Sequence, residues 1–484
     1  MDEDPVRSHE RLHQVFHLVD LSSLSISSVA PIFSVAAAGS VMVRAAGPAV
    51  PLAIVLIALP FIASSGIFLS LNQHFPNAGA SYHWSRRILG FDYSNFQAWI
   101  IIMAYFWSIP PILIPAAQFT LSILGDNTPT NLLQIVVAMG WALFATSVLL
   151  WGAKMTARVT QMFLVIEVVS VLVMGIWGYS VWGHVIHGGT IFAIGHIRWP
   201  GVIVCMVIAA TIVDGWEIDS YAAEESQKPL IAPGWGGIIG ALGVAVYYLT
   251  IWPILLHEVP LHTLETSPDV LTIWSKTVAP GFLPWIRIAI LASTAGSLWL
   301  TSYILSRALF AMSRDGVLPF WLGRLNRHKA PMWAIVIPVG SSAAVIVLQL
   351  MFPSMNALFT LVLSAAGFFL VAEFLLDGIN MAVFLLRHHA TLRHDLKTHH
   401  HAVLFLGSLF VVLTLGLLEG LFLVYGPRYI GPDIDWVTVV MIGVGLLHVL
   451  WIKAVRRQQT IVFNPDAGDL FAAGPVAWRL SQDK

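Results

Sequence analysis

Charged residues are scarce in this sequence of 484 residues: they make up 11% of the chain, whereas 57% of the residues are hydrophobic. Soluble domains usually carry about 25% charged residues, and the mean hydropathy here is +0.79. The composition therefore excludes a soluble enzyme, a nucleic-acid-binding protein and a disordered scaffold. It also excludes an outer-membrane barrel, whose strands alternate polar and apolar residues over about 10 positions. An α-helical membrane protein remains, because a helix satisfies its own backbone polar groups in lipid.

Cysteine is almost absent as well. The chain has one cysteine, Cys205, which excludes an intrachain disulfide and a cysteine cluster that could hold a metal. We therefore expect no metal site and no cofactor. The net charge of −1 implies no electrostatic attraction to nucleic acid. Residues 1–20 contain several charged residues and lack the apolar run of a secretory signal, so we expect a cytoplasmic tail.

Apolar segments long enough to cross a bilayer recur along the whole chain. One crossing needs about 20 apolar residues, and the connections between the segments are mostly short. The twelve candidate spans are residues 21–43, 48–71, 96–123, 132–151, 159–182, 201–222, 235–256, 288–312, 332–352, 355–386, 402–425 and 436–452. The sequence therefore predicts an all-α polytopic membrane protein with twelve transmembrane helices, surrounded by membrane lipids and without a soluble domain.

The distribution of lysine and arginine predicts the orientation, because these residues favour cytoplasmic loops. When the N-terminus is placed on the cytoplasmic side, Arg307 lies within a span and few basic residues lie in loops on the opposite side of the membrane. Those outside are Arg44, Arg198, Lys276, Arg287 and Arg428. We therefore expect both termini to be cytoplasmic in the plasma membrane. Three cytoplasmic segments follow from this topology: the tail 1–20, a solvated His-rich loop at 387–401 and the tail 454–484.

Two of the predicted spans are interrupted near their middles. The first contains Pro31, which lacks an amide hydrogen and clashes with the carbonyl four residues earlier. The sixth contains Asp214 followed by Gly215. These two spans cross the membrane in opposite directions, and broken helices at matching places in inverted halves are typical of a binding site at the midplane. The alternative is that both are ordinary kinks, since Gly and Pro are frequent in membrane helices.

Three passages at the ends of predicted spans carry a more specific pattern. They are Phe75-Pro76-Asn77-Ala78-Gly79-Ala80-Ser81-Tyr82 after the second span, Gly215-Trp216-Glu217 with Glu225-Ser226-Gln227-Lys228-Pro229 at the sixth, and the residues from Ser306 to Pro319 at the eighth. Together they resemble the amino acid–polyamine–organocation family of secondary transporters, which includes amino acid permeases. Ala80 and Phe310 depart mildly from the family pattern, where glycine and tyrosine stand. The resemblance covers the first ten spans.

The resemblance implies a leucine-transporter-type fold. Its core would be residues 21–386, with two inverted five-helix repeats at about 21–183 and 200–386. The last two spans, within 402–453, would be peripheral. An amino acid or a related amine is the implied substrate, and it would bind between the two broken spans.

The family's site, carried over to matching positions, implies roles for particular residues. The amide end of a broken helix suits a carboxylate, and the candidates for this role are Ser27, Ser28 and the backbone of Val29, Ala30, Pro31 and Ile32. The carbonyls of Ile212 and Val213 would bind the substrate ammonium. Trp216 could shape or occlude the pocket, and Tyr105 in the third span could line it or merely pack. The two serines could equally serve helix packing as small residues.

Acidic residues within the spans are expensive and usually face a cavity or a partner. Asp214 could bind the substrate ammonium, take up a proton, or cap backbone amides at the break. Glu167 falls where some proton-coupled relatives have a lysine; it could load and release a proton, or pair with hydroxyls of neighbouring helices. Glu373 and Asp377 share one face of the tenth span and could form a gate with cytoplasmic Arg or Lys, or line a cavity on the cytoplasmic side.

These features predict a secondary active transporter that moves an amino acid by alternating access, with proton symport as the energy source. Asp214 and Glu167 are the proton-coupling candidates. Sodium coupling is the less favoured choice, because the hydroxyls of the eighth span that could bind sodium are also common helix-packing groups. An exchanger, or a transporter of polyamines or cationic amino acids, is the alternative within the family. A channel is the alternative outside it, and an enzyme is not expected.

Overall fold

The computed structural model describes residues 11–126, 128–183, 197–348, 355–387, 398–455 and 461. Within these residues nine segments are long and apolar enough to cross a membrane, and the helices Trp199–Val213 and Met332–Val347 are apolar but shorter. The longest segment, Leu18–His74, contains two of the predicted spans. Each predicted span therefore coincides with a helix or a pair of helices, and the predicted all-α polytopic fold is confirmed.

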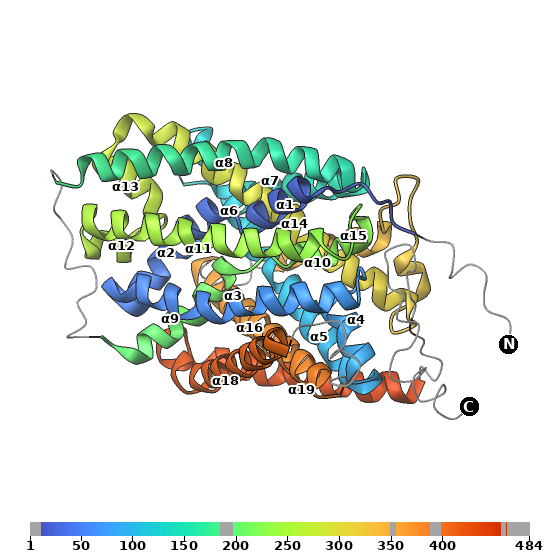
Figure 1. The fold of residues 1–484 in the computed structure, drawn as a ribbon. Coiled ribbons are helices and arrows are strands. Elements are labelled where there is room, and N and C mark those ends of the chain that lie inside the picture. Colours follow the sequence, from blue (N-terminus) through green and yellow to red (C-terminus); the bar gives the residue numbers. More distant parts are fainter. Residues whose placement is uncertain are drawn as a thin grey trace, which may run out of the picture.

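The helices lie roughly parallel or antiparallel to one axis (Figure 1). The first five spans are α1 (Leu18–Val29) with α2 (Pro31–Ala46), α3 (Val50–His74), α5 (Phe91–Ser108) with α6 (Pro110–Ile123), α7 (Asn131–Leu150) and α8 (Ala153–Val181). The next five are α9 (Trp199–Val213) with α10 (Ile218–Tyr221), α11 (Ala232–Glu258), α14 (Leu283–Arg314), α15 (Met332–Leu348) and α16 (Met355–Arg387). The last two are α18 (Thr398–Tyr429) and α19 (Asp433–Val455).

Short helices lie between the long ones. They are η1 (Gly47–Ala49), α4 (Ala80–Ile88), η3 (Ala223–Glu225), α12 (Leu261–Thr266), α13 (Val270–Val278), η4 (Pro280–Phe282) and η5 (Phe320–Gly323). In Figure 1, α4 lies at the right end of the molecule, whereas α12 and α13 lie at the left end. We refer to these two ends as the α4 end and the α13 end.

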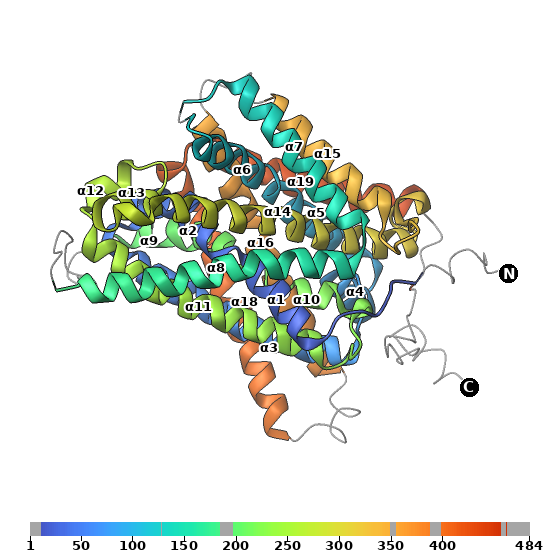
Figure 2. The ribbon, with the colours of Figure 1, turned by 90° about the horizontal axis from the view of Figure 1, so that it is seen from above.

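Two groups of helices pack around the broken spans. In the first, α3 packs on α11 and α9, and α1 packs on α11. In the second, α7 and α15 lie side by side and pack on α6 and α14, as Figure 2 shows at the upper right. α14 runs between the groups and contacts α1, α2, α5, α6 and α8. Small residues such as Ser293, Gly296 and Ser297 permit this close approach of backbones.

The helix ends differ from the predicted boundaries of the cytoplasmic segments. α1 begins at Leu18, inside the predicted tail 1–20, and residues 1–10 lie outside the described part of the chain. α18 begins at Thr398, so the predicted loop 387–401 is shorter; residues 388–397, which include several of its histidines, lie outside the described part. α19 continues to Val455, and the rest of the predicted tail 454–484, except residue 461, is likewise not described.

Candidate functional site

The first broken span changes direction at a single residue. α1 ends at Val29, and Ala30 has the left-handed conformation with φ 48° and ψ 61° before α2 begins at Pro31. A residue before proline is sterically disfavoured in the right-handed helical region. The amide of Ala30 turns back and donates to Ser27 O at 3.1 Å. Pro31 thus interrupts the span and sits in the first turn of α2, where its missing N–H costs least.

The second broken span opens over a longer stretch. α9 ends at Val213, Asp214 is extended, and Gly215 has φ +117°, which favours glycine. A Cβ atom on Gly215 would lie 2.8 Å from both the Ser28 carbonyl carbon and the Val29 nitrogen. The two breaks are therefore in direct backbone contact, and glycine is what allows that contact.

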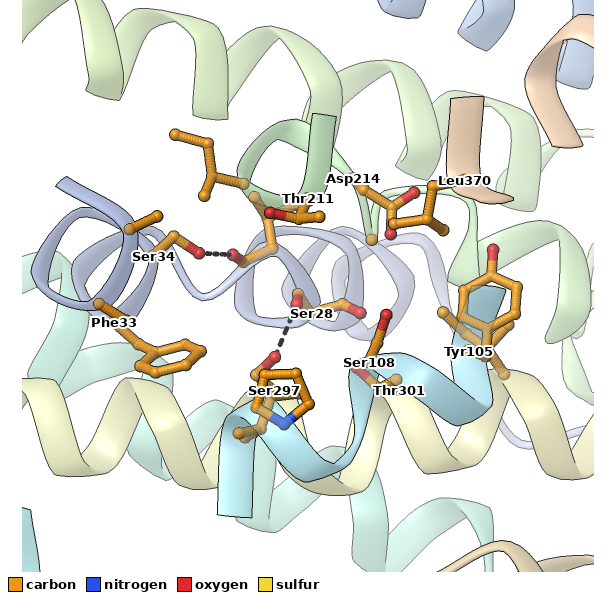
Figure 3. Close-up of a pocket in the computed structure, with 18 residues that line it drawn as sticks. Ser28, Phe33, Ser34, Tyr105, Ser108, Thr211, Asp214, Ser297, Thr301 and Leu370 are labelled. Carbon is orange, nitrogen blue, oxygen red and sulfur yellow. Dashed lines mark hydrogen bonds between the residues drawn. The ribbon is translucent and has the colours of Figure 1, made fainter. Parts of the chain in front are cut away.

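A cavity lies beside this junction (Figure 3). Five residues predicted for the site line it, namely Ser28, Val29, Ile212, Asp214 and Gly215. The other lining residues are Phe33, Ser34, Ala37, Ala38, Tyr105, Ser108, Pro111, Ile112, Thr211, Ser297, Thr301, Ile304 and Leu370. In Figure 3, Phe33 and Ser34 lie at one side and Tyr105 at the other, with Ser28 between them. α1, α2, α5, α6, α9, α14 and α16 thus all contribute to the wall.

The remaining residues predicted for the site lie near the junction but do not line this cavity. Ser27 turns away and its hydroxyl donates to Glu167 Oε1 at 3.3 Å. Pro31 lines a separate, mostly apolar pocket that also contains Glu167. Trp216 is 1% exposed and packs against Phe68, with ring centroids 5.1 Å apart. Ala30, Ile32 and Val213 shape the backbone at the breaks.

Among the described residues, Asp214 is the one acidic residue in the cavity wall, and no Lys, Arg or His of this part of the chain belongs to that wall. Its Oδ1 atom is buried and has no hydrogen-bond partner among the described residues. The break is capped by Glu217, whose Oε2 accepts from the Gly215 amide at 2.9 Å and whose Oε1 accepts from Tyr105 Oη at 3.0 Å. The Asp214 carboxyl also interacts with the Gly215 amide and with Glu217, so both acids cap the break, and the unpartnered Oδ1 of Asp214 is the atom available to a ligand.

Hydroxyl groups already satisfy part of the exposed backbone at the junction. Tyr248 donates to the Ile212 carbonyl, and Ser34 Oγ donates to the Val29 carbonyl at 2.9 Å. Ser297 Oγ lies 3.5 Å from the Ser28 carbonyl. A carbonyl oxygen has two lone pairs, so a substrate ammonium can still share these acceptors with the hydroxyls.

Glu167 lies behind the first break rather than in the cavity. Its Oε1 accepts from Ser27 of α1, and its Oε2 accepts from Ser293 of α14 at 3.0 Å. Ser293 Oγ also accepts from the Phe33 amide at 3.2 Å, in the first turn of α2. Glu167 of α8 is therefore connected to α1 and α14 through two hydroxyls, and through Ser293 to the first turn of α2. A change in its charge would alter the hydrogen bond between Ser293 and Phe33, and Phe33 lines the cavity. Within the described residues no group of three or more His, Cys, Asp or Glu could hold a metal ion.

The three sequence motifs meet in one buried polar layer at the α4 end. Arg307 of α14 binds Glu225 at 2.9 Å, and Tyr303 donates to the same carboxylate. Arg314 binds Glu224, which also accepts from the Ala78 amide at 3.0 Å. The third pair joins Arg86 of α4 to Asp315 at 3.5 Å. The chain before α1 covers this layer, because Val15 N and Phe16 N donate to Glu225 O at 2.8 and 2.9 Å.

An aromatic cluster lies between the cavity and this layer of ion pairs. Phe374, one helical turn beyond the cavity residue Leu370 on α16, packs against Trp216 and Phe68 at 5.4 and 5.5 Å between ring centroids. Phe68 also packs edge-on against Trp84 of α4. The cavity is therefore closed toward the α4 end by two successive layers, one aromatic and one ionic.

Known proteins are similar to this chain over most of its length. A model of the family described as amino acid permease matches residues 16–447. A protein of Lactococcus lactis subsp. cremoris (strain MG1363) named branched-chain amino acid permease BcaP is 24% identical over 361 residues, which cover 67% of this chain and 74% of the relative. A Bacillus subtilis (strain 168) protein of the same name is 23% identical over 64% of this chain and 70% of its own length. An Arabidopsis thaliana protein named cationic amino acid transporter 3, mitochondrial, is 22% identical over 70% of this chain and 58% of its own length.

Proposed function

Because this chain belongs to the amino acid permease family, and is therefore a multi-pass membrane transporter of amino acids rather than an enzyme, we propose that it carries a neutral amino acid with an aliphatic side chain. The observation that carries this proposal is the make-up of the cavity wall, in which the described lining residues combine one carboxyl group, Asp214, with otherwise uncharged side chains. Two relatives named as branched-chain amino acid permeases give it further support.

The site can match each part of such a substrate. The ammonium binds Asp214 Oδ1 and the carbonyls that end α9. The carboxylate binds near the start of α2, where the helix dipole and the Ser28 hydroxyl, which has no hydrogen-bond partner among the described residues, favour a negative group. The aliphatic side chain packs against Phe33, Pro111, Ile112, Ile304 and Leu370. Apolar contact of this kind discriminates sizes by about 1–3 kcal/mol per methylene, so related aliphatic amino acids would compete with one another.

The substrate test is a ligand panel on the purified protein. Binding to the folded state raises the melting temperature by mass action, and we expect leucine, isoleucine and valine to raise it more than lysine, arginine or putrescine. Asp214→Asn should weaken leucine binding at least about tenfold, which corresponds to about 1.4 kcal/mol. Asp92→Asn is the matched control, because Asp92 is exposed and pairs with Lys453 on the surface. A larger effect of lysine or putrescine would favour a cationic substrate instead.

Transport would proceed by alternating access, and we assign the α4 end to the cytoplasm because the loops there are rich in Lys and Arg. The structure then corresponds to a state closed toward the cytoplasm. Opening would need the ion pairs of Glu224, Glu225 and Asp315 to separate. The group of α1, α3, α9 and α11 would move relative to α5, α7, α8 and α14, between which the cavity lies.

Proton symport is the energy source that we assign, with Glu167 as the coupling group. Its carboxyl contacts only hydroxyl donors among the described residues, so it has no cation to hold it ionised. Glu167→Gln should keep counterflow of internal for external leucine in proteoliposomes, and should lose concentrative uptake driven by a pH gradient. If the variant still concentrates leucine under a pH gradient, Glu167 is structural. Counterflow without gradient-driven uptake in the unmodified protein would indicate an obligate exchanger.

A further inference from the structure

A second set of buried carboxyls extends from the cavity toward the α4 end. Asp214 and Glu217 lie in the link between α9 and α10, and Glu373 and Asp377 lie one turn apart on α16. Glu217, Glu373 and Asp377 are at most 1% exposed. We call these four groups the carboxyl row.

Tyrosines join the members of the row. Tyr105 donates to Glu217 at 3.0 Å, and Tyr221 donates to Glu373 Oε1 at 2.7 Å. The rings of these two tyrosines are themselves in contact, with centroids 5.9 Å apart. Tyr105 also lines the cavity. The row is therefore connected from the substrate site to the middle of α16 through polar groups.

Every hydrogen bond that the structure gives to the row comes from a neutral donor. Asp377 accepts from Ser81 at 2.6 Å, from Gln97 at 2.8 Å and from Asn380 at 3.1 Å. Glu373 Oε2 is buried and has no partner among the described residues. The buried arginines nearby are already engaged: Arg86 binds Asp315, Arg307 binds Glu225 and Arg314 binds Glu224.

The carboxyl row has only neutral donors, whereas the acids at the α4 end are paired with arginines, and this difference has an electrostatic consequence. Four ionised carboxyls without a cation would place a charge of about −4 inside the membrane, where even one unpaired charge costs several kcal/mol. Carboxyls that share such a site cannot all be ionised at once. They titrate as a coupled set, so that the charge of one raises the cost of ionising the next. The row must therefore hold protons while the α4 end is closed, and Glu373 Oε2, which accepts from no donor among the described residues, is an atom that can carry one.

Helix α4 connects the row to the ion pairs that close this end. Ser81 faces the row and donates to Asp377, whereas the next residue, Tyr82, donates to Asp315 at 3.1 Å in the layer of ion pairs. A movement of α4 that breaks the ion pairs would also withdraw Ser81 from Asp377. We propose that Glu373 and Asp377 form a proton-binding site, separate from Glu167, that releases its protons toward the α4 end when α4 moves away.

Other titratable and charged groups lie on the elements packed against α16, and within the described part of the chain no ion pair joins any of them to the row. α5 contributes Tyr105 and Tyr93, whose hydroxyl donates to the Leu376 carbonyl at 3.2 Å. α10 contributes Tyr221. On the remaining neighbours of α16, the groups are Arg86 and Arg87 of α4, His74 of α3, Glu419 of α18 and Lys453 of α19. His74 packs on Phe384 near the end of α16, and Lys453 binds Asp92 on the surface.

The test combines two measurements on the full chain in lipid vesicles. The first is leucine counterflow over a series of symmetric pH values, and the second is the infrared band of protonated carboxyls over the same series. In the unmodified protein we expect counterflow to slow as the pH rises, by up to about tenfold per pH unit for a step limited by one proton, and part of the infrared band to disappear in parallel. Glu373→Gln and Asp377→Asn should each flatten the pH profile and remove that part of the band.

Three further variants guard the interpretation. Glu373→Asp keeps a carboxyl and should restore the pH response, as should Asp377→Glu, whereas a purely structural role would not follow the carboxyl. Glu419→Gln is the matched control, because Glu419 is a buried acid of α18 whose oxygens have no partner in the described chain; it should remove only its own contribution to the infrared band and leave the pH profile of counterflow and the pH-dependent part of the band unchanged. If the Gln and Asn variants keep the pH profile and the band, the proposal is wrong. If lysine rather than a proton removes the band, the row binds a cationic side chain, which also overturns it.

The proposed proton site depends on the proposed function only in the first measurement, leucine counterflow, because the infrared band needs no transported substrate. Failure of every amino acid to exchange in the unmodified protein would refute the substrate assignment, while the infrared band would still test the proton site. Should Glu373→Gln or Asp377→Asn fail to fold, Tyr221→Phe tests the same row, since it removes the donor to Glu373 Oε1. It should shift the pH response of the band, and an unshifted band would contradict the proposal.

Discussion

Asp269 illustrates how a single carboxyl outside the membrane can set a pH response. It precedes α13, and its Oδ1 accepts from the amides of Leu271 and Thr272 at 2.9 and 3.2 Å. Its Oδ2 is buried without a partner in the described chain. Burial raises the pKa of Asp269 from 3.8 to about 6, against the lowering effect of these hydrogen bonds.

The raised pKa of Asp269 predicts a loss of stability as the pH rises. Between about pH 4 and 6 the unfolded chain has already released this proton and the folded chain has not, so the folded state loses up to about 3 kcal/mol across that window. Asp269→Asn keeps the Oδ1 acceptor and removes the ionisation. We expect its melting temperature to exceed that of the unmodified protein at pH 7 and to match it near pH 4.

Thermal unfolding of the purified protein at both pH values measures this difference. Glu265→Gln, an acid-to-amide change in the neighbouring α12, is the matched control. A melting temperature of Asp269→Asn that stays below that of the unmodified protein at pH 7 would show that the ionised carboxyl is needed for the cap of α13.

At the scale of elements, the two broken helices act as one unit. Pro31 interrupts the first and Gly215 the second, and the backbones meet where a Cβ on Gly215 would lie 2.8 Å from Val29 N. Neither break would form the cavity alone, because its wall combines hydroxyls from α1, α2 and α14 with the carboxyl of Asp214. Their contact makes the shape of the cavity wall depend on the packing of the two broken helices.

Gly215→Ala should therefore separate the two breaks. A left-handed conformation costs a non-glycine residue about 1–2 kcal/mol, and the Cβ atom must also push the Ser28–Val29 backbone away. We expect leucine affinity to fall at least about tenfold while the protein still inserts and purifies as a single species. Gly140→Ala in α7 is the control, because nothing lies within 4 Å of its Cβ position. Unchanged affinity in Gly215→Ala would place the substrate elsewhere.

At the scale of the whole molecule, the two ends are chemically different. The α4 end carries three buried ion pairs and the segment before α1, whereas the α13 end is covered by α12 and α13. The predicted twelve spans are an even number of crossings, so the segment before α1 and the end of α19 would lie on the same side of the membrane. The orientation of that assembly decides which end opens to the cytoplasm.

Two cysteine substitutions measure this orientation. Thr266 of α12 and Arg327, in the segment after η5, are both exposed. The two segments that contain them lie at opposite ends of the molecule (Figure 1). Cys205 is buried and should stay silent toward reagents that need an accessible thiol. Thr266→Cys should react with a membrane-impermeant thiol reagent on intact cells, and Arg327→Cys only after permeabilisation. The reverse pattern would invert the assigned orientation, and reaction of both on intact cells would contradict the twelve-span topology.

The sequence by itself determined the helical membrane fold, because only helices can satisfy the backbone in lipid, and twelve apolar stretches of the required length can be counted directly. It also located both breaks, since Pro31 and Gly215 restrict or free the backbone whatever surrounds them. Which side chains face the cavity was decided by tertiary structure. Ser27 and Ser28 are adjacent, yet successive helical residues point about 100° apart, so one binds Glu167 and the other lines the cavity.

The partners of the acids were also decided by tertiary structure. A gate between Asp377 or Glu373 and a basic residue was a reasonable hypothesis from charge alone, but Glu224, Glu225 and Asp315 lie closer to the arginines once α4, η3 and α14 pack together, and the α16 carboxyls are left with neutral donors.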